Sequence, residues 1–166
     1  MERIMIIGCP GSGKSTLAVK LAEKLKLPLI HLDKLYWKEG WVESSAQEFS
    51  EKLEKALEQT RWIIDGNYGA TIRQRLEKAD TVIFLDYSRY LCMERAIKRI
   101  IFGYGKTRSD MGDGCPERMD LDFLKYIWFF RKNNRPGLAE MIAKTPEKVI
   151  IIRNRKEYQC FFKKIF

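Results

Sequence analysis

The stretch Arg3–Thr16, with the sequence RIMIIGCPGSGKST, decides the fold of this chain. Its first six residues form a short apolar run of the kind that becomes a buried β-strand. Gly8–Ser15 then follows the pattern G-x-x-x-x-G-K-[ST], and Lys14–Lys26 repeats leucine every four residues, as an amphipathic helix does. A strand, a glycine-rich turn and a helix in this order predict a loop that wraps around phosphate groups. A purely structural turn is the alternative, but a chance match in this context is rare.

The spacing of this motif has a physical reason. Glycine lets the backbone come close to phosphate oxygens, and successive N–H groups point inward toward the anion. The helix that follows presents free N–H groups and the positive end of its dipole. We expect Lys14 to reach the β- and γ-phosphates and the Ser15 hydroxyl to bind Mg²⁺. The sequence therefore predicts ATP and Mg²⁺ as cofactors, with the nucleotide held by Gly8, Cys9, Pro10, Gly11, Ser12, Gly13, Lys14, Ser15 and Thr16.

Apolar runs alternate with helical patterns along the rest of the chain. Further strands are expected at Leu29–Asp33, Trp62–Asp65, Thr81–Asp86 and Lys148–Ile152. Helices are expected at 46–59, where Ser45 and Glu48 have capping-box spacing, at about 88–102 after Ser88, at 120–132 and at the C-terminus. Such alternation predicts an α/β fold in three layers, a five-stranded parallel sheet with helices on both faces. At this length one domain, residues 1–166, is expected.

The segment Gly103–Asp120 interrupts the alternation. It is rich in glycine and contains Pro116, so we interpret the segment from about residue 103 to about residue 120 as a mobile lid, 103–120. Seven of the 13 arginines lie between residues 89 and 135, and two of them, Arg108 and Arg118, lie within the lid. Arginine binds phosphate in a bidentate manner, so we expect these two to close on the transferred group. For any single arginine, a solvated surface charge is the alternative.

Acidic residues end three of the predicted strands. The carboxyl ends of parallel strands meet at the edge of the sheet where ligands bind. We therefore expect Asp33 to orient a substrate hydroxyl or accept its proton, and Asp65 to help Ser15 hold Mg²⁺, through water. A helix cap or a turn is the alternative for Asp33, and an Asp-Gly turn for Asp65. For Asp86 a capping role is favoured.

Composition and charge narrow the function classes. Hydrophobic residues make up 45% and charged residues 32%, as in a globular protein. No apolar run approaches the roughly 18 residues that a membrane helix needs, so no membrane association and a cytoplasmic location are expected. The four cysteines lack C-x-x-C spacing and there is one histidine, His31, so neither zinc nor disulfides are expected. The net charge is +9; residues 1–83 contribute +1 and residues 84–166 contribute +8. The second half therefore attracts an anion or is merely well solvated. Nucleic acid, a membrane surface and phosphorylated small molecules are all compatible with this charge.

The segment Gly8–Thr16 resembles the P-loop of nucleoside and nucleotide kinases, a group that includes adenylate and shikimate kinases. With HLD at 31–33, DGNY at 65–68, TRSDM at 107–111 and CPER at 115–118, the chain is similar to the adenylate-kinase-related topology modulation proteins. The resemblance implies a P-loop fold with strand order 2-3-1-4-5, ATP with Mg²⁺, and a lid that carries arginines. Adenylate kinases have Asp-Gly-Phe-Pro-Arg after the third strand, whereas Asp65–Gly69 lacks the arginine that grips an acceptor phosphate. The acceptor therefore stays open.

Two functions are compatible with these residues. The leading one is a Mg²⁺-dependent kinase that transfers the γ-phosphoryl group of ATP to a nucleotide, a nucleoside or another hydroxylated metabolite. Its candidate catalytic residues are Lys14, Asp33, Arg108 and Arg118. The alternative is an ATP-binding regulator of DNA topology that associates with nucleic acid through its basic second half. A monomer and a dimer are both compatible with the sequence.

Replacing Lys14 with alanine tests the motif directly. The substitution removes a charge-assisted contact to the phosphates, so we expect ATP affinity to fall by about tenfold or more. Isothermal titration calorimetry measures this affinity. Unchanged affinity in Lys14→Ala would show that the nucleotide site has been placed wrongly.

Overall fold

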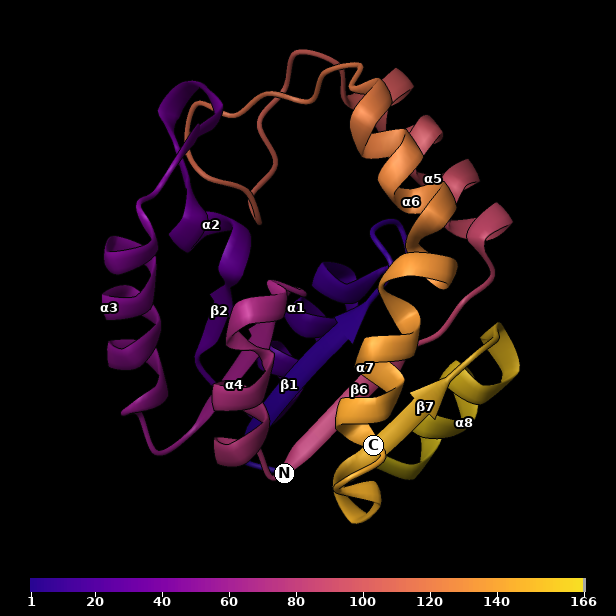
Figure 1. Ribbon diagram of the computed structural model, residues 1–166. Helices are drawn as coiled ribbons and strands as arrows, with labels where there is room; N and C mark the ends of the chain where they lie inside the picture. The colour runs from indigo at the N-terminus through magenta and orange to yellow at the C-terminus, as the bar shows by residue number, and fades with distance from the viewer. Residues whose placement is uncertain (166) are drawn as a thin grey trace.

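Five parallel strands form the central sheet of the computed structural model, which describes residues 1–165 (Figure 1). They are β1 (Arg3–Gly8), β2 (Leu29–His31), β5 (Trp62–Asp65), β6 (Thr81–Leu85) and β7 (Val149–Ile152). The sheet order is β2-β5-β1-β6-β7, and every neighbouring pair is parallel. In chain order these are the second, third, first, fourth and fifth strands of the sheet. The predicted fold class and the order 2-3-1-4-5 are confirmed.

The central strand β1 is buried on both faces. Ile4, Met5, Ile6 and Ile7 are all fully buried, which explains why this strand is continuously apolar instead of alternating. In register, Ile4 lies between Ile63 of β5 and Thr81 of β6. Helices cover both faces, with α4 and α7 in front of the sheet and α1 behind it in Figure 1. The apolar core thus fixes where β1 ends and the glycine-rich loop begins.

The helices match the sequence pattern in the main. They are α1 (Lys14–Leu25), α2 (Leu32–Tyr36), α3 (Ala46–Leu57), α4 (Ile72–Lys78), α5 (Arg89–Gly103), α6 (Leu121–Asn133), α7 (Arg135–Ile142) and α8 (Arg155–Ile165). None of the helices within residues 1–165 is long and apolar enough to cross a membrane. Ser88 caps α5 as predicted. Asp86 instead receives two hydrogen bonds from Arg135, at 2.8 and 2.7 Å, so the capping role favoured for Asp86 is wrong.

Several short elements differ from the sequence prediction. The second strand ends at His31, so Asp33 lies in the first turn of the five-residue helix α2 and not on the strand. A small hairpin of β3 (Trp37–Lys38) and β4 (Val42–Glu43) follows. Helices α4 and α7 are also additional to the prediction. They have seven and eight residues, too few for a clear hydrophobic period, and α7 carries a proline in its first turn, where the missing N–H costs little.

The connection between α5 and α6, residues 104–120, is the lid loop. It packs on the β3–β4 hairpin through three hydrogen bonds. The Gly40 N–H donates to the Gly114 carbonyl at 3.0 Å, the Cys115 thiol donates to the Lys38 carbonyl at 3.1 Å, and the Trp41 indole donates to the Pro116 carbonyl at 3.1 Å. The lid loop is therefore docked in this structure. Its mobility stays a prediction.

The capping box of α3 gives a test of local stability. The Ser45 hydroxyl accepts from the Glu48 N–H and the Glu48 carboxylate accepts from the Ser45 N–H. We expect Ser45→Ala to lower the free energy of unfolding by about 1 kcal/mol, measured by urea denaturation. Ser50→Ala makes the same chemical change inside α3 and serves as the control. Equal losses in the two variants would contradict the importance of the cap.

Candidate functional site

The glycine-rich loop spans the gap between the end of β1 and the start of α1. Gly11 has φ +83°, and a Cβ there would lie 2.3 Å from the carbonyl oxygen of Cys92 in α5. A side chain at this position would therefore force the loop away from α5. Arg95 of α5 holds the same loop by donating to the Ser12 carbonyl at 3.2 Å. The loop backbone is thus fixed in its curled form by α5 as well as by β1.

The segment after β5 braces the start of this loop. The Asn67 side chain accepts from the Gly8 N–H at 3.1 Å and donates to the Gly8 carbonyl at 2.8 Å. Asn67 is held in turn by Arg75, whose guanidinium donates to the carbonyls of Gly66, at 2.9 Å, and of Asn67. Arg75 is fully buried, and this burial lowers its pKa to about 9, against the pull of Asp65. The DGNY segment therefore serves as a scaffold for the loop.

Lys14 begins α1 and bends back over the loop. Its ammonium donates to the Cys9 carbonyl at 3.3 Å. Desolvation lowers the pKa of Lys14, while the charges of Asp65 and Asp33 act in the opposite direction. The Lys14 side chain thus lies near the carboxylates of Asp65 and Asp33 and is bonded to the backbone of the loop. This is the placement that the motif predicts for a residue that binds phosphate.

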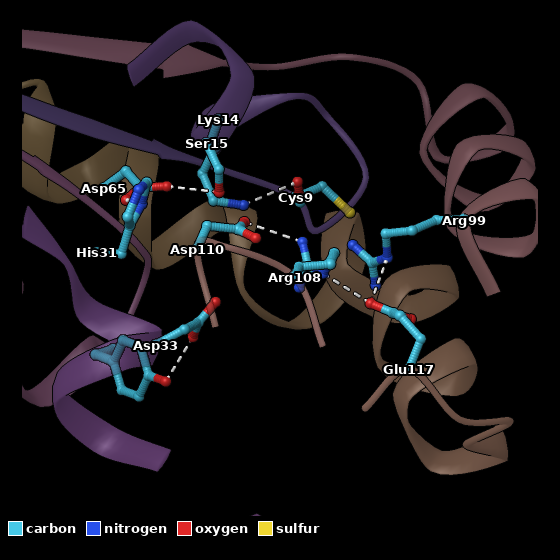
Figure 2. Close-up of polar contacts among 11 residues, drawn as sticks. Cys9, Lys14, Ser15, His31, Asp33, Asp65, Arg99, Arg108, Asp110 and Glu117 are labelled. Atoms are coloured by element: carbon cyan, nitrogen blue, oxygen red, sulfur yellow. Dashed lines mark hydrogen bonds and ion pairs between the residues drawn. The ribbon is translucent and has the colours of Figure 1, made fainter. Parts of the chain in front are cut away.

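Ser15 and Asp65 lie together, as predicted for a metal site (Figure 2). The Ser15 hydroxyl donates to Asp65 Oδ2 at 2.8 Å. The other oxygen of Asp65 lies 2.5 Å from His31 Nδ1. Burial would lower the pKa of His31, but the hydrogen bond and charge of Asp65, helped by Asp110, outweigh it and raise the pKa. His31 therefore fixes the orientation of the Asp65 carboxylate.

Asp33 faces the same cleft from α2. Its Oδ1 accepts from the Tyr68 hydroxyl at 2.6 Å, which leaves Oδ2 for another partner. Desolvation raises the pKa of Asp33, and the Tyr68 hydrogen bond, Lys14 and Arg108 pull it down. Tyr68 stands among aromatic rings, with the centroids of Tyr36 and Phe49 each 5.0 Å from its own. Tyr68 therefore holds Asp33 rigidly at the wall of the cleft.

The lid arginines take two different places. Arg108 points toward the glycine-rich loop, where its guanidinium bonds Asp110 at 2.9 Å and lies 2.8 Å from Glu117 (Figure 2). Arg99 of α5 reaches the same Glu117 oxygen at 3.0 Å. Arg118 instead stacks 4.9 Å from the ring centre of Trp41 and is 3.8 Å from Asp120. Part of the positive charge between residues 89 and 135 is therefore neutralised within the fold.

One cleft of about 1360 Å³ brings most of these residues together. Lys14, Ser15, Asp33, Asp65, Arg108 and Arg118 all line it, together with loop residues Pro10, Gly11, Gly13 and Thr16. Gly8, Cys9 and Ser12 are buried behind this lining. Arg73 and Arg75 are outside the lining, since Arg75 braces the DGNY segment and Arg73 pairs with Glu77 at 3.4 Å. Neither replaces the acceptor-binding arginine that the sequence lacks.

Sequence reasoning missed four residues of this site. His31, Asn67, Tyr68 and Asp110 each contact a residue that the motifs pointed to. His31 ends β2 and Asn67 follows shortly after the end of β5, so the strand-edge argument applied to Asp33 and Asp65 could have included them. Asp110 lies in the lid loop near Arg108, and it was missed because only the arginines of this loop were considered as phosphate ligands.

The fold and site together define a nucleotide-binding P-loop protein, and comparison with known proteins extends this. Residues 4–101 match the family described as AAA domain. A shikimate kinase of Rhodococcus jostii is 32% identical over 138 residues, which cover 74% of this chain and 78% of that protein. A provisionally named adenylate kinase of Pyrococcus furiosus is 28% identical over 156 residues, covering 89% and 79%. A crystal structure of shikimate kinase from Bacteroides thetaiotaomicron matches with a TM-score of 0.57 and 16% identity over 99% of this chain and 95% of that one.

The family match covers more than half of the chain, and the Rhodococcus relative exceeds 30% identity over most of it. The chain therefore belongs to this AAA-domain family, among the P-loop kinases related to shikimate and adenylate kinases. The crystal structure adds that the fold is shared from end to end.

The Tyr68–Asp33 contact gives a prediction about protonation. Because the Tyr68 hydroxyl stabilises the ionised carboxylate, Tyr68→Phe should raise the pKa of Asp33 above its already raised value. Tyr36→Phe removes a hydroxyl from the same aromatic cluster and is the control. Titration of the Asp33 carboxyl carbon by NMR measures both. A shift of the same size in the control would contradict the role of the hydrogen bond.

Proposed function

We propose that this protein transfers the γ-phosphoryl group of ATP to a hydroxyl of a small molecule bound beside Asp33, in a Mg²⁺-dependent reaction. One observation carries the proposal: Asp33 and Lys14 line the same cleft, and Tyr68 binds only one of the two carboxylate oxygens of Asp33. A donor-side cation and an acceptor-side carboxylate within one cavity are what an in-line transfer needs. The acceptor stays open among nucleotides, nucleosides and other hydroxylated metabolites.

The part of the cleft that would hold the phosphoryl donor fits a nucleoside triphosphate. The positive φ of Gly11 and its close approach to α5 shape a cradle that a Cβ would disrupt. The twelve-residue helix α1 starts at this cradle, so its free N–H groups favour an anion there. Lys14, and Arg108 from the lid loop, supply cations for the charge that develops on the transferred group. Arg118, stacked on Trp41 of the hairpin, is better placed to bind an anionic or polar part of the acceptor.

The chemistry of the donor set fits Mg²⁺. Ser15 and Asp65 offer a hydroxyl and a carboxylate, the hard oxygen ligands that Mg²⁺ prefers, and phosphate oxygens and water complete such sites. No group of three or more His, Cys, Asp and Glu within residues 1–165 is arranged to hold a metal by itself, in keeping with a metal that arrives with its nucleotide. When bound, Mg²⁺ would neutralise phosphate charge. His31 keeps Asp65 oriented for it.

Asp33 acts on the acceptor in this proposal. Tyr68 holds one oxygen of Asp33. The other oxygen accepts a hydrogen bond from the acceptor hydroxyl and takes its proton as the hydroxyl oxygen bonds to the γ-phosphorus. The bond from the γ-phosphorus to the bridging oxygen of ATP breaks in the same step, and ADP leaves. The aromatic residues Trp37, Trp41 and Tyr68 line the same part of the cleft and would exclude water. The lack of a free arginine after β5 disfavours a phosphate on the acceptor at that position. A hydroxylated metabolite without phosphate there is the best fit.

The alternative, an ATP-binding regulator of DNA topology, has less support. The basic residues between 89 and 135 include Arg99, Arg108 and Arg135, which are paired with carboxylates of the fold. The C-terminal helix α8 retains the exposed residues Lys163 and Lys164. Similarity to topology modulation proteins and a cytoplasmic location stay predictions, as does the choice between monomer and dimer. DNA binding that weakens steeply with salt, without kinase activity, would favour the regulator.

An ADP-release screen with Asp33→Asn tests the proposal. The panel contains nucleoside monophosphates, nucleosides and hydroxylated metabolites, shikimate among them because two relatives are shikimate kinases. With the best acceptor, Asp33→Asn should lower kcat by about 100-fold or more while ATP still binds.

Asp122→Asn makes the same chemical change at an exposed aspartate on α6. It is the matched control and should keep full activity. Lys14→Ala should lose ATP binding. ADP release that no acceptor stimulates in the wild-type protein would overturn the proposal.

A further inference from the structure

The lid loop delivers one acidic side chain, Asp110, to the glycine-rich loop. Contacts on both sides of Asp110 hold it there. Gly112 packs so closely on the Trp37 carbonyl that a Cβ would approach it to 2.2 Å, and the Cys115 thiol bonds the Lys38 carbonyl at 3.1 Å. Met111 and Cys115 are buried. The position of Asp110 is thus held by the packing of its neighbours on the β3–β4 hairpin as well as by its ion pair with Arg108.

Asp110 makes the contacts that a phosphate group would make. Its carboxylate accepts from Arg108 at 2.9 Å, and Ser15 and His31 lie close enough to stabilise its negative charge (Figure 2). Burial opposes ionisation, but Arg108, Ser15 and His31 outweigh it and lower the pKa of Asp110. Asp110 is 8% exposed and therefore poorly screened by solvent. A negative charge stands beside the Ser15 hydroxyl before any ligand arrives.

The charge of Asp110 should repel metal-free nucleotide much more strongly than the Mg²⁺ complex. Metal-free triphosphate would bring its own negative oxygens against Asp110 and compete with it for Arg108. With Mg²⁺ the same carboxylate meets a complex whose phosphate charge is partly neutralised, so the repulsion largely disappears. Asp65 lies on the other side of Ser15 and adds to the difference.

We propose that Asp110 is a specificity-determining residue that makes the site select metal-bound over metal-free nucleotide. The inference rests on the proposed function, since it takes the cleft as the ATP site. It assigns the lid loop a role besides supplying arginines: the loop discriminates between triphosphates by their net charge. In the proposed function the acceptor is bound by Asp33 and not by Asp110, so the acceptor chemistry should not depend on Asp110.

The test compares ATP dissociation constants in EDTA and in excess Mg²⁺, measured by calorimetry for the wild type and for Asp110→Asn. Asparagine keeps the shape of the side chain and an oxygen that can accept from Arg108, so the lid loop should stay docked. We expect the ratio of the metal-free to the Mg²⁺ dissociation constant to fall by about tenfold or more, chiefly through tighter metal-free binding. Inorganic tripolyphosphate in EDTA should show the same gain without a base or ribose.

Two variants make the outcome specific. Asp113→Asn removes an exposed carboxylate from the same loop and should leave the ratio at its wild-type value. Asp110→Ala shares with Asp110→Asn only the lost charge and should lower the ratio in the same direction. Thermal unfolding confirms that each variant is folded.

The outcomes separate this inference from the proposed function. If the wild-type protein binds Mg²⁺ and ATP together but the two Asp110 variants keep the wild-type ratio, the selectivity proposal alone is overturned. If the wild-type protein binds ATP in neither condition, the proposed nucleotide site falls, and the selectivity proposal with it. An equal change in Asp113→Asn would show a general effect of loop charge, which also overturns the role of Asp110.

Discussion

The pair of hydrogen bonds between the Asn67 side chain and the backbone of Gly8 is the contact on which the site depends. It joins the end of β1 to the segment after β5, at the edge where both strands stop. Through Gly8 it fixes the start of the glycine-rich loop, and through its neighbours it fixes Asp65 and Tyr68. Arg75 holds Asn67 in place by donating hydrogen bonds to the backbone carbonyls of Gly66 and Asn67. A buried arginine thus stabilises main-chain geometry at the site without meeting a ligand.

Buried charges in this region are balanced in small groups. Asp65 is hydrogen-bonded to Ser15 and His31. Asp33 is hydrogen-bonded to Tyr68 and stabilised by the charge of Lys14. Glu117 forms ion pairs with both Arg99 and Arg108. Each group leaves at least one side chain able to exchange its internal partner for a ligand. Exchange costs less than creating a bond to an unpaired buried group, because desolvation has already been offset within the fold. This balance explains how so many ionisable residues coexist in one cleft.

Hydrophobic period and the glycine-rich motif were enough to predict the centre of the fold. Arg3–Lys26 indicated the strand, the loop and α1, and the apolar runs at 62–65 and 81–86 indicated the neighbouring strands, because buried parallel strands are continuously apolar. The same patterns could not predict α2, which converts Asp33 from a strand end into a helix residue, since five residues carry no helical period. Nor could they predict that Asp110 meets Ser15, because that contact joins residues far apart in the chain through a loop without regular structure. Lid-loop mobility and the assigned roles of the site residues stay predictions.

The hydrogen bonds between the β3–β4 hairpin and the lid loop have a kinetic consequence. Both segments border the same cleft, and they are joined at Gly40, Cys115 and Trp41. Neither can swing outward alone without losing these bonds, so the predicted opening of the lid would move both flanks of the cleft together. Entry of the first ligand and departure of the last product would then share a single barrier, and a substitution in these contacts would change both rates together.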